Sequence, residues 1–363
     1  MIEVRKDIFL KDYSTFKIGG RAKYFVFVES ISQLREAIDF AKEKKVPFFI
    51  IGGGSNILFS DNEYKGLIIK NQNSKIKIQK YNSRLKIFCG AGTSLIKLVF
   101  RTSEIGAVGL EWAAGIPGTI GGAVFGNAGA LGGEIKNVLK TVKILNIRNL
   151  NEEIFDWSKC KFSYRSSVFK ERIGEFIIFE VEINLKKGNG EKIKEKIDKN
   201  ILYRKNHQPL NFPSAGSIFK NIELSDDLIK KFPEFKKFED KIELSRHNRR
   251  GVPFASLNFI KAKSGKSEKF DSAKSGAFAF RGNKIPAAYL IDKCGLKKKT
   301  IGGAQVSEKQ PNFILNVGNA KAEDVLNLIN LITEKVKNKF GILLEREIRI
   351  IEPVAKIIKQ RVY

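Results

Sequence analysis

Two glycine-rich segments carry the clearest chemical signal in this sequence. In the first, a Gly-Gly-Gly-Ser-Asn run at residues 52–56 directly follows an apolar run at residues 48–51. Glycine lets main-chain N–H groups approach an anion closely, and consecutive amides can form a concave nest for a phosphate. The third glycine of the Rossmann dinucleotide fingerprint would fall at Ile57, and a strand-like segment follows where that fingerprint needs a helix. The run therefore predicts a phosphate-binding loop outside a Rossmann fold.

The second glycine-rich segment covers residues 114–130 and is longer than the first. From Gly115 it reads Gly-Ile-Pro-Gly-Thr-Ile-Gly-Gly-Ala. Small side chains here leave room for a long flat ligand or for a diphosphate. Each segment alone could equally be a tightly turned packing element. Two of them in one basic chain favour a dinucleotide cofactor.

A different chemistry is suggested by Ser217 and Lys220, which have the Ser-x-x-Lys spacing of penicillin-interacting acyl-transfer enzymes. The Ser-Asp-Asn run at residues 60–62 matches a second motif of that group. In those enzymes the second motif follows the nucleophile in the chain, whereas here it precedes it. The order argues against acyl transfer, and labelling of Ser217 by a fluorescent penicillin would revive it.

Cysteine and histidine are too sparse and too scattered to indicate a metal centre. The three cysteines are Cys89, Cys160 and Cys294, and the only histidines are His207 and His247. Widely spaced cysteines in odd number fit neither a disulfide framework nor a zinc site. We expect free thiols in a reducing compartment and no metal.

The composition indicates a globular, strongly basic chain. It has 363 residues, a length that fits two or three domains, and a formal net charge of +27. Such a balance suits nucleic acid, an anionic membrane face or phosphorylated small molecules. The lysine runs are short and lack interleaved aromatic residues, so no nucleic-acid module is indicated. The plainer interpretation is lysine spread over all solvated faces.

No segment resembles a signal peptide or a membrane span. Residues 1–16 carry several charges and no apolar core. The low-charge stretch at residues 106–133 is full of glycine, so we expect loops there. The sequence therefore predicts a cytoplasmic protein that does not bind membranes.

Hydrophobic patterning predicts a mixed α+β chain around these segments. Ser30 and Gln33 form a capping-box-like start for a helix whose apolar face spans residues 31–41. Gly341 is suited to follow the end of an amphipathic helix. The other predicted elements are strands at 48–51, 67–69, 76–78 and 85–89, a helix at 94–104, strands at 142–147 and 176–185, helices at 191–203 and 325–336, and a closing strand at 342–351.

Taken together, several motifs resemble the UDP-N-acetylenolpyruvoylglucosamine reductase family. They occur in that family's order, cover nearly the whole chain, and jointly are highly specific. The form with Gln-Pro and Pro-Ser ahead of Gly-Ser resembles the shorter class, which lacks a substrate-capping tyrosine loop. The matching segments are residues 15–20, 52–56, 114–130, 164–169, 208–209, 213–221, 301–309 and 345–349.

The resemblance implies a vanillyl-alcohol-oxidase/p-cresol-methylhydroxylase-like FAD-binding fold in two subdomains, followed by a C-terminal α+β substrate domain. On this chain the FAD-binding subdomains would cover residues 1–72 and 73–205, the second joined by the closing strand at 342–354. The substrate domain would cover residues 206–341. Within it, residues 222–284 form an insertion that is atypical of the family and could be a lid, a partner-binding element or loose chain.

The resemblance also implies an NADPH-dependent, FAD-containing reductase. Its reaction converts UDP-N-acetylglucosamine enolpyruvate to UDP-N-acetylmuramate during peptidoglycan precursor synthesis, so its partner is a UDP-linked enolpyruvyl sugar. The resemblance specifies no oligomeric state. The residues expected to bind FAD are Gly52, Gly53, Gly54, Ser55, Asn56, Ala114, Gly115, Ile116, Pro117, Gly118, Thr119, Gly121, Gly122, Asn127 and Gly129.

By the same resemblance, three residues carry the chemistry. Ser217 would donate a proton, Arg165 would bind and polarise the substrate carboxylate, and Glu347 would help to stabilise charge. Arginine suits a carboxylate because its planar fork can bind both oxygens. The expected substrate contacts are Tyr164, Asn221, Gln305 and Arg349.

Two other functions remain open at this point. An oxidase of the same fold would often tether FAD through histidine or cysteine, and the glycine-rich segments here contain neither. A basic nucleic-acid-binding protein would be colourless and would lose its affinity as salt is added. A yellow protein with flavin absorbance bands would favour the reductase.

Overall fold

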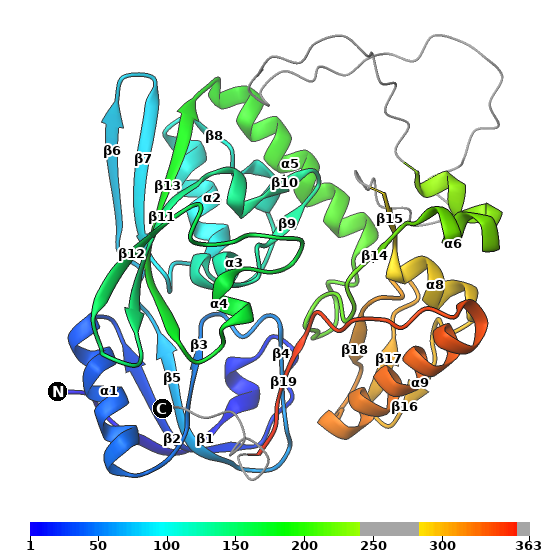
Figure 1. The fold of residues 1–363 in the computed structure, drawn as a ribbon, viewed down its shortest axis with the longest axis horizontal. Helices are drawn as coiled ribbons and strands as arrows, with labels where there is room; N and C mark the ends of the chain where they lie inside the picture. The colour runs from blue at the N-terminus through cyan, green and yellow to red at the C-terminus, as the bar shows by residue number, and fades with distance from the viewer. Residues whose placement is uncertain (240–282, 354–363) are drawn as a thin grey trace. The chain divides into compact units, whose positions relative to one another are not determined.

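The computed structural model describes residues 1–239 and 283–353. The chain divides into two compact units, one of residues 1–222 with 286–363 and the other of residues 223–285. In the larger unit, helices pack against three separate groups of strands (Figure 1). The α+β architecture expected from the sequence is confirmed.

The first group is a four-stranded sheet with helix α1 (Ile31–Glu43) packed against it. Its strands, in spatial order, are β1 (Arg5–Phe9), β2 (Arg21–Val28), β5 (Tyr64–Asn71) and β3 (Phe48–Ile51). β2, β5 and β3 run parallel, whereas β1 runs antiparallel to β2. The Ser30 hydroxyl accepts a hydrogen bond from the Gln33 main-chain N–H at 3.1 Å, so the predicted start of α1 is confirmed.

The second group is an antiparallel sheet of six strands. Helices α2 (Leu95–Glu104), α3 (Ile120–Phe125) and α5 (Gly190–His207) contribute side chains to its core. The predicted helices at 94–104 and 191–203 are therefore confirmed, the second being longer at its C-terminal end. The strands are β12 (Glu152–Asp156), β11 (Leu139–Asn146), β13 (Phe176–Lys187), β7 (Arg84–Gly90), β6 (Ile76–Tyr81) and β8 (Ala107–Val108).

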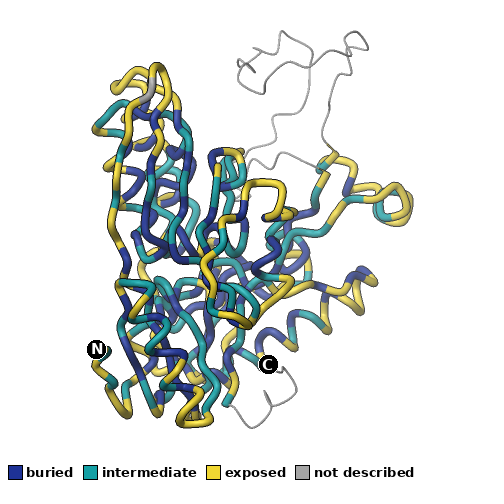
Figure 2. Tube along the Cα trace, turned by 60° about the vertical axis from the view of Figure 1, so that its left-hand side comes forward, coloured by how far each residue is buried: buried dark blue, intermediate teal, exposed yellow. Residues whose placement is uncertain are grey.

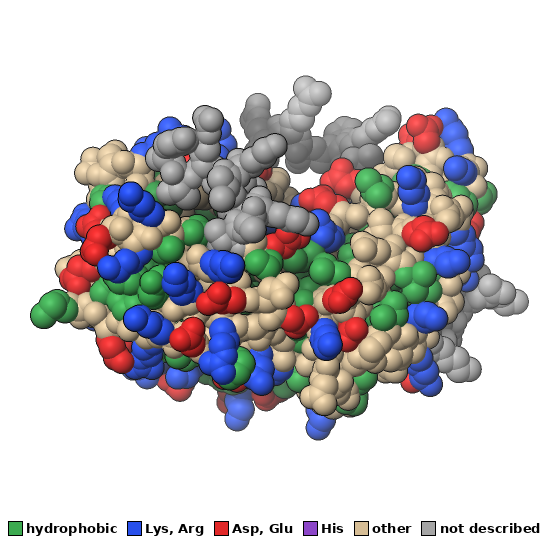
Figure 3. Space-filling view, turned by 90° about the horizontal axis from the view of Figure 1, so that it is seen from below, with side chains coloured by type: hydrophobic (Ala, Val, Ile, Leu, Met, Phe, Trp, Pro, Cys, Tyr) green, Lys and Arg blue, Asp and Glu red, His purple; other side chains and the backbone are tan. Residues whose placement is uncertain are grey.

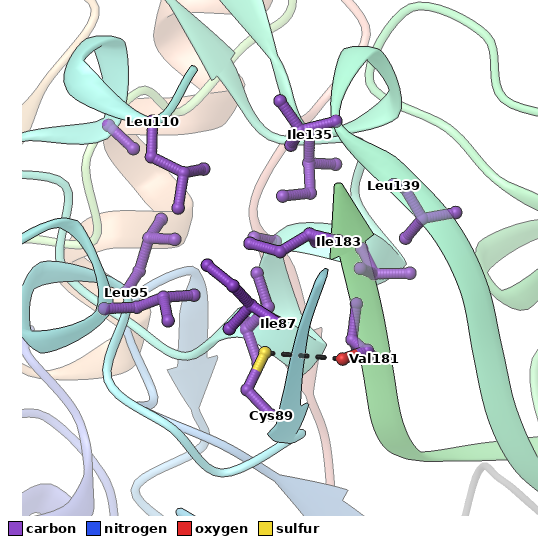
Figure 4. Close-up of a cluster of buried hydrophobic side chains, with 14 of the residues drawn as sticks. Ile87, Cys89, Leu95, Leu110, Ile135, Leu139, Val181 and Ile183 are labelled. Carbon is purple, nitrogen blue, oxygen red and sulfur yellow. Dashed lines mark hydrogen bonds between the residues drawn. The ribbon is translucent and has the colours of Figure 1, made fainter. Parts of the chain in front are cut away.

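The core of this second group is closely packed and contains a buried thiol (Figure 4). Ile87 and Leu95 belong to the same cluster of buried side chains, and Cys89 Sγ lies 3.5 Å from the Val181 carbonyl oxygen. Burial raises the pKa of the Cys89 thiol to about 12. The thiol is therefore a packing group, because only the thiolate is a good nucleophile. Figure 2 shows buried positions along the inner strands and exposed ones at many of the turns.

The third group is built around α9 (Ala322–Phe340), which ends at Gly341 in the left-handed conformation with φ 70°. This confirms the predicted helix and its cap. The other elements are α8 (Ala287–Lys293), β16 (Thr300–Ile301), β17 (Ala304–Val306) and β18 (Ile314–Asn316).

Residues 106–133 were expected to be loops, and that prediction is partly wrong. Helix α3 lies within the stretch, together with the short pieces η2 (Glu111–Ala113), β9 (Gly129–Ala130) and β10 (Gly133–Glu134). Thr119 caps α3 by accepting a hydrogen bond from the Gly122 N–H at 3.3 Å. A Cβ added at Gly121 would lie 2.7 Å from the Ala91 Cβ, so this helical glycine serves close packing.

The closing strand is shorter than expected and has a different neighbour. β19 covers only Arg349–Ile351 and pairs in parallel with β4 (Ile57–Phe59), within residues 1–72 rather than 73–205. The main chain ahead of β19 is bonded elsewhere: Glu345 O accepts from Lys220 N, and Glu347 N donates to Ile218 O, both at 2.8 Å. These contacts keep residues 342–348 out of a regular ladder.

The smaller unit coincides closely with the expected insertion. Residues 223–239 form α6 (Asp226–Lys231) and the short helix η4 (Pro233–Phe238), so this part is more regular than expected. Phe235 is fully buried between the rings of Phe232 and Phe238. β14 (Ile222–Glu223) pairs with β15 (Lys284–Ile285). The rest of the predicted insertion lies outside the described residues.

Candidate active site

The two glycine-rich segments lie against each other, main chain to main chain. A Cβ added at Gly53 would lie 2.6 Å from the Gly118 Cα. The Ser55 hydroxyl donates to the Pro117 carbonyl oxygen at 3.2 Å, which ties the segments together. Such close approach requires glycine on both sides. The structure therefore brings together two predicted binding loops that are about sixty residues apart in sequence.

The first loop has the features of an anion-binding nest. The Gly52 carbonyl accepts from Lys70 Nζ at 2.7 Å, and the Gly54 carbonyl accepts from the Thr15 N–H at 3.1 Å. By contrast, within the described parts of the chain the N–H groups of Gly53 and Ser55 donate to no protein acceptor. Gly54 has φ 64°, which is costly for other residues. Free main-chain amides in such a loop fit a diphosphate.

Gly53→Ala should therefore separate the loops and weaken cofactor binding. The added methyl group would meet main-chain atoms of Gly118, which cannot move aside as a side chain can. Overpacking of this kind costs about 1–3 kcal/mol. We expect a lower melting temperature and a raised FAD dissociation constant, measured by thermal unfolding and by flavin fluorescence.

Gly190→Ala provides the matched control for this substitution. Gly190 opens α5, and an added Cβ there would meet nothing within 4 Å. Replacing such a glycine usually stabilises by about 0.4–1 kcal/mol. Equal FAD affinities for the Gly53 and Gly190 variants would contradict a cofactor site at the contact of the two loops.

Arg204 on α5 supports the second loop from the interior, a role that the sequence reasoning missed. Its Nε donates to the Ala114 carbonyl at 2.8 Å and its Nη2 to the Trp112 carbonyl at 3.3 Å. Only 7% of Arg204 is exposed, and burial lowers its pKa to about 10. Its position on the face of Ile193 and Ile197 was a usable signal, because an arginine on the apolar face of a helix needs buried partners.

Gly121 and Asn127, two of the expected cofactor contacts, have other roles. The Gly121 N–H is bonded to the Ala91 carbonyl at 2.9 Å within the packed core. Asn127 is fully buried, and its amide donates to Ser163 O at 2.8 Å and to Glu134 Oε2 at 3.2 Å. Asn127 thus fixes the chain around β9 and β10 and has no donor left for a ligand.

Arg165 and Glu347, predicted to act together, are in contact. Arg165 Nε lies 2.9 Å from Glu347 Oε1, and Arg165 Nη2 donates to the Gly129 carbonyl at 2.7 Å. Both side chains are about four-fifths buried. The Nε–H itself makes no hydrogen bond with any described residue, so the contact is an ion pair of imperfect hydrogen-bond geometry. The Nη1 group makes no hydrogen bond to any described residue, so the guanidinium retains donor capacity for a bound anion there.

Ser217 is next in the chain to a residue that is hydrogen-bonded to the main chain of Glu347. The next residue, Ile218, accepts at its carbonyl from the Glu347 N–H and donates to the Asn312 carbonyl, both at 2.8 Å. Ser217 itself forms an isolated bridge with Phe313 and is half-buried. Asn312, which the sequence reasoning missed, also donates to Phe219 O at 2.9 Å. The half-buried serine is therefore held next to the segment that carries Glu347.

The expected substrate contacts are only partly brought together. The Tyr164 hydroxyl accepts from the Asn221 N–H at 3.3 Å, and its ring lies 5.4 Å from the Arg165 guanidinium. Burial, helped by Glu347 and opposed by Arg165, raises the pKa of Tyr164. The Asn221 amide oxygen accepts from the Ala287 N–H at 3.2 Å. Gln305 makes its side-chain hydrogen bond to Thr300 and is not linked to this group.

Lys170 on α4 (Val168–Glu171) positions Arg165 and was also missed. Its Nζ donates to the Arg165 carbonyl at 2.9 Å, and Arg165 has a left-handed φ of 53°. A left-handed arginine is strained, so the bond helps to hold its guanidinium toward Glu347. Burial lowers the pKa of Lys170, with Lys220 acting in the same direction and Glu347 against it. The sequence signal that could have identified Lys170 was its position five residues after Arg165, within reach of the Arg165 main chain.

Lys170→Met should lower kcat for the expected UDP-sugar about tenfold and change KM less, because a charge-assisted hydrogen bond contributes about 1.5–3 kcal/mol and Arg165 is expected to polarise the substrate carboxylate. Steady-state kinetics with varied UDP-sugar measures both constants. Lys159→Met, at an exposed lysine, is the matched control. An unchanged kcat in the Lys170 variant would show that the carbonyl contact does not position Arg165.

Two known protein-domain families match this chain, one in each half. Residues 208–351 match the C-terminal domain of UDP-N-acetylenolpyruvoylglucosamine reductase, and residues 22–149 match an FAD-binding domain. The expected flavin fold is thereby confirmed. In the described residues, no helix has both the length and the apolar character needed to cross a membrane.

Relatives of this name match over nearly their whole length. The UDP-N-acetylenolpyruvoylglucosamine reductase of Caldicellulosiruptor bescii is 36% identical, over 96% of this chain and 91% of that protein. The corresponding enzyme of Caldanaerobacter subterraneus is 35% identical, over 94% and 91%. The crystal structure of the reductase MurB from Thermus caldophilus aligns with a TM-score of 0.67 at 27% identity, over 97% of this chain and 100% of that one.

Proposed function

Because this chain belongs to the UDP-N-acetylenolpyruvoylglucosamine reductase family, we propose that Arg165, Ser217 and Glu347 carry out its reaction. The protein is an oxidoreductase that uses NADPH and FAD to convert UDP-N-acetylglucosamine enolpyruvate to UDP-N-acetylmuramate. The observation that carries the assignment is the 2.9 Å contact of Arg165 with Glu347 beside the segment of Ser217.

The cofactor fits the paired glycine loops. The free amides of Gly53 and Ser55 are suited to its diphosphate, and the contact of Gly53 with Gly118 leaves main chain rather than side chains facing a ligand. Ala114 and Gly115 are braced from behind by Arg204. When bound there, FAD would supply hydride transfer from NADPH to the enolpyruvyl double bond.

Arg165 is placed to bind the carboxylate of the enolpyruvyl group. Its Nε faces Glu347 and its Nη2 is bonded to the Gly129 carbonyl, whereas its Nη1 makes no hydrogen bond to any described residue and can donate to a carboxylate oxygen. Negative charge grows on this carboxylate and on the adjacent carbon as hydride reaches the terminal carbon. A fixed cation in a half-buried site stabilises that charge more than it stabilises the substrate. Arg165 therefore accelerates the reaction and does more than bind.

Ser217 then donates its hydroxyl proton to the carbon that carries the carboxylate. The acceptor is a strongly basic, carbanion-like centre, so a weak acid held in place is sufficient. Glu347 keeps the Arg165 side chain in position through their ion pair. We propose this residue as the group that assists charge stabilisation, with Tyr164 and Asn221 as neighbouring substrate contacts.

The experiment that tests the proposed function separates its two halves. Under anaerobic conditions the purified protein is mixed with FAD and NADPH, and loss of the oxidised flavin absorbance is followed. The UDP-linked enolpyruvyl sugar is then added. We expect rapid return of the oxidised spectrum and formation of UDP-N-acetylmuramate. Reduced flavin that persists after the sugar is added would refute the assigned substrate.

We further propose a cytoplasmic protein with FAD-binding subdomains at residues 1–72 and 73–205 and a substrate domain at 206–341. Its positive charge is best explained by general lysine enrichment: on the face shown in Figure 3, cationic and anionic side chains are interspersed. A phosphate-tracking groove would need a continuous basic stripe. Salt-resistant, sequence-specific binding to duplex DNA would contradict this interpretation.

A further inference from the structure

Arg349 is a cation that lacks an acidic partner. Its guanidinium carbon lies 4.7 Å from the centre of the Phe49 ring and 5.1 Å from that of Phe125. Among the described residues it forms no ion pair, and its side chain makes no hydrogen bond to them. The neighbouring cations differ, since Arg165 pairs with Glu347 and Lys220 with Glu345. Lys170 also lacks an ion pair, but its Nζ donates to the Arg165 carbonyl, whereas the Arg349 side chain has neither an acidic partner nor a hydrogen bond among the described residues.

The energetic balance at Arg349 calls for an anion. Two aromatic faces return about 0.5–2 kcal/mol each to a cation. Removing an ion from water costs several kcal/mol, so the rings alone do not offset the burial. Burial correspondingly lowers the pKa of Arg349 to about 10. A negatively charged group from outside the chain would complete the site.

The position of Arg349 indicates where this anion comes from. The Arg349 N–H donates to the Asn56 carbonyl at 3.1 Å, at the end of the first glycine loop. Phe125, the second aromatic contact of the guanidinium, is the last residue of α3 in the second glycine-rich segment. Arg349 thus contacts both loops expected to hold FAD. It is also two residues from Glu347, near the reacting atoms rather than at a remote part of the ligand.

We propose that Arg349 stabilises the negative charge that bound FAD acquires when it is reduced. This rests on FAD binding by the family and deepens the proposed function. A hydride brings one proton and two electrons, so its transfer from NADPH adds one unit of negative charge to the flavin and releases NADP⁺. Arg349 supplies the compensating cation in a site with little water. It is thereby assigned to the cofactor and not, as the sequence resemblance implies, to the substrate.

The test compares the affinities of the two redox forms of FAD in the absence of substrate. In Arg349→Met, we expect the preference for reduced over oxidised FAD to fall about ten- to a hundredfold. For a two-electron couple this lowers the midpoint potential by about 30 to 60 mV. Arg349→Lys keeps the charge and should shift it much less. Arg346→Met, at an exposed arginine of the same segment, is the matched control and should leave the potential unchanged.

The outcomes are distinguishable from failure of the proposed function. A parental midpoint potential in Arg349→Met, with or without a raised KM for the UDP-sugar, would overturn the proposal. If that variant holds FAD weakly, the dissociation constants of oxidised and reduced FAD are measured separately, because their ratio contains the same information. Failure of the parental protein to reoxidise with the UDP-sugar would instead refute the proposed function and leave this result intact.

Discussion

Replacing Ser217 by alanine is expected to abolish reduction of the UDP-sugar while flavin reduction by NADPH continues at the parental rate. The hydroxyl is the proposed proton donor, and it sits beside the segment that carries Glu347. Loss of a positioned acid typically lowers the rate about a hundred- to ten-thousand-fold. Stopped-flow absorbance under anaerobic conditions measures each half-reaction separately. The oxidative half should slow and the reductive half should not.

Two companion variants make the Ser217 result specific. Ser214→Ala removes a hydroxyl from the same segment that makes no hydrogen bond to any described residue, whereas the Ser214 carbonyl accepts one from the Thr15 hydroxyl. It should leave both half-reactions unchanged. Ser217→Cys keeps an ionisable proton and should retain part of the oxidative rate. Parental turnover in Ser217→Ala would show that the proton comes from another donor.

The helices were predictable where local sequence determines them. α1 and α2 each start at a serine that caps the first turn, Ser30 and Ser94, and α9 ends at Gly341. These signals lie within a few residues of the element they specify, so one sequence is enough. α3 escaped prediction because glycine is a poor helix former, and one of its two glycines, Gly121, is required by close contact with Ala91.

The closing strand shows the limit of periodicity. Residues 342–351 alternate in a manner typical of a strand, yet only Arg349–Ile351 joins a ladder. The preceding residues bond to the main chain of Ile218 and Lys220, over a hundred residues away in sequence. A period-two pattern reports burial on one face and does not identify the partner. The predicted placement beside residues 73–205 therefore failed.

The residues of the candidate site also fall into those that the sequence identified and those that it did not. Arg165, Ser217 and Glu347 could be named because each lies in a motif with a family resemblance. Arg204 and Lys170 were missed, since they act through carbonyl oxygens of Ala114 and Arg165 and no motif describes such supporting contacts; for Arg204 the available signal was its place on the apolar face of a helix. Residue type also misled the prediction at Asn127, a polar residue in a glycine-rich loop that proved fully buried. Its amide is used to bind the protein's own main chain.

Arg165→Met is expected to lower kcat/KM for the UDP-sugar about a hundred- to a thousandfold. Each charge-assisted hydrogen bond to a carboxylate contributes about 1.5–3 kcal/mol, and a guanidinium can form two. Arg165→Lys should recover little, because an ammonium cannot form the planar fork. Arg172→Met is the control, since Arg172 is half-exposed and pairs with Glu175 on the surface. Steady-state kinetics of the four proteins tests these differences.

The ion pair between Arg165 and Glu347 leads to a prediction for the double variant Arg165→Met, Glu347→Gln. If Glu347 acts largely by holding Arg165, its loss should matter much less once Arg165 is gone, and the two effects on kcat/KM should fall well short of multiplying. Independent action would give the full product of the single effects. The 2.9 Å contact between two side chains that are about four-fifths buried favours coupling, because neither charge has another charged partner among the described residues. A fully multiplicative double variant would mean that the carboxylate acts on the substrate directly.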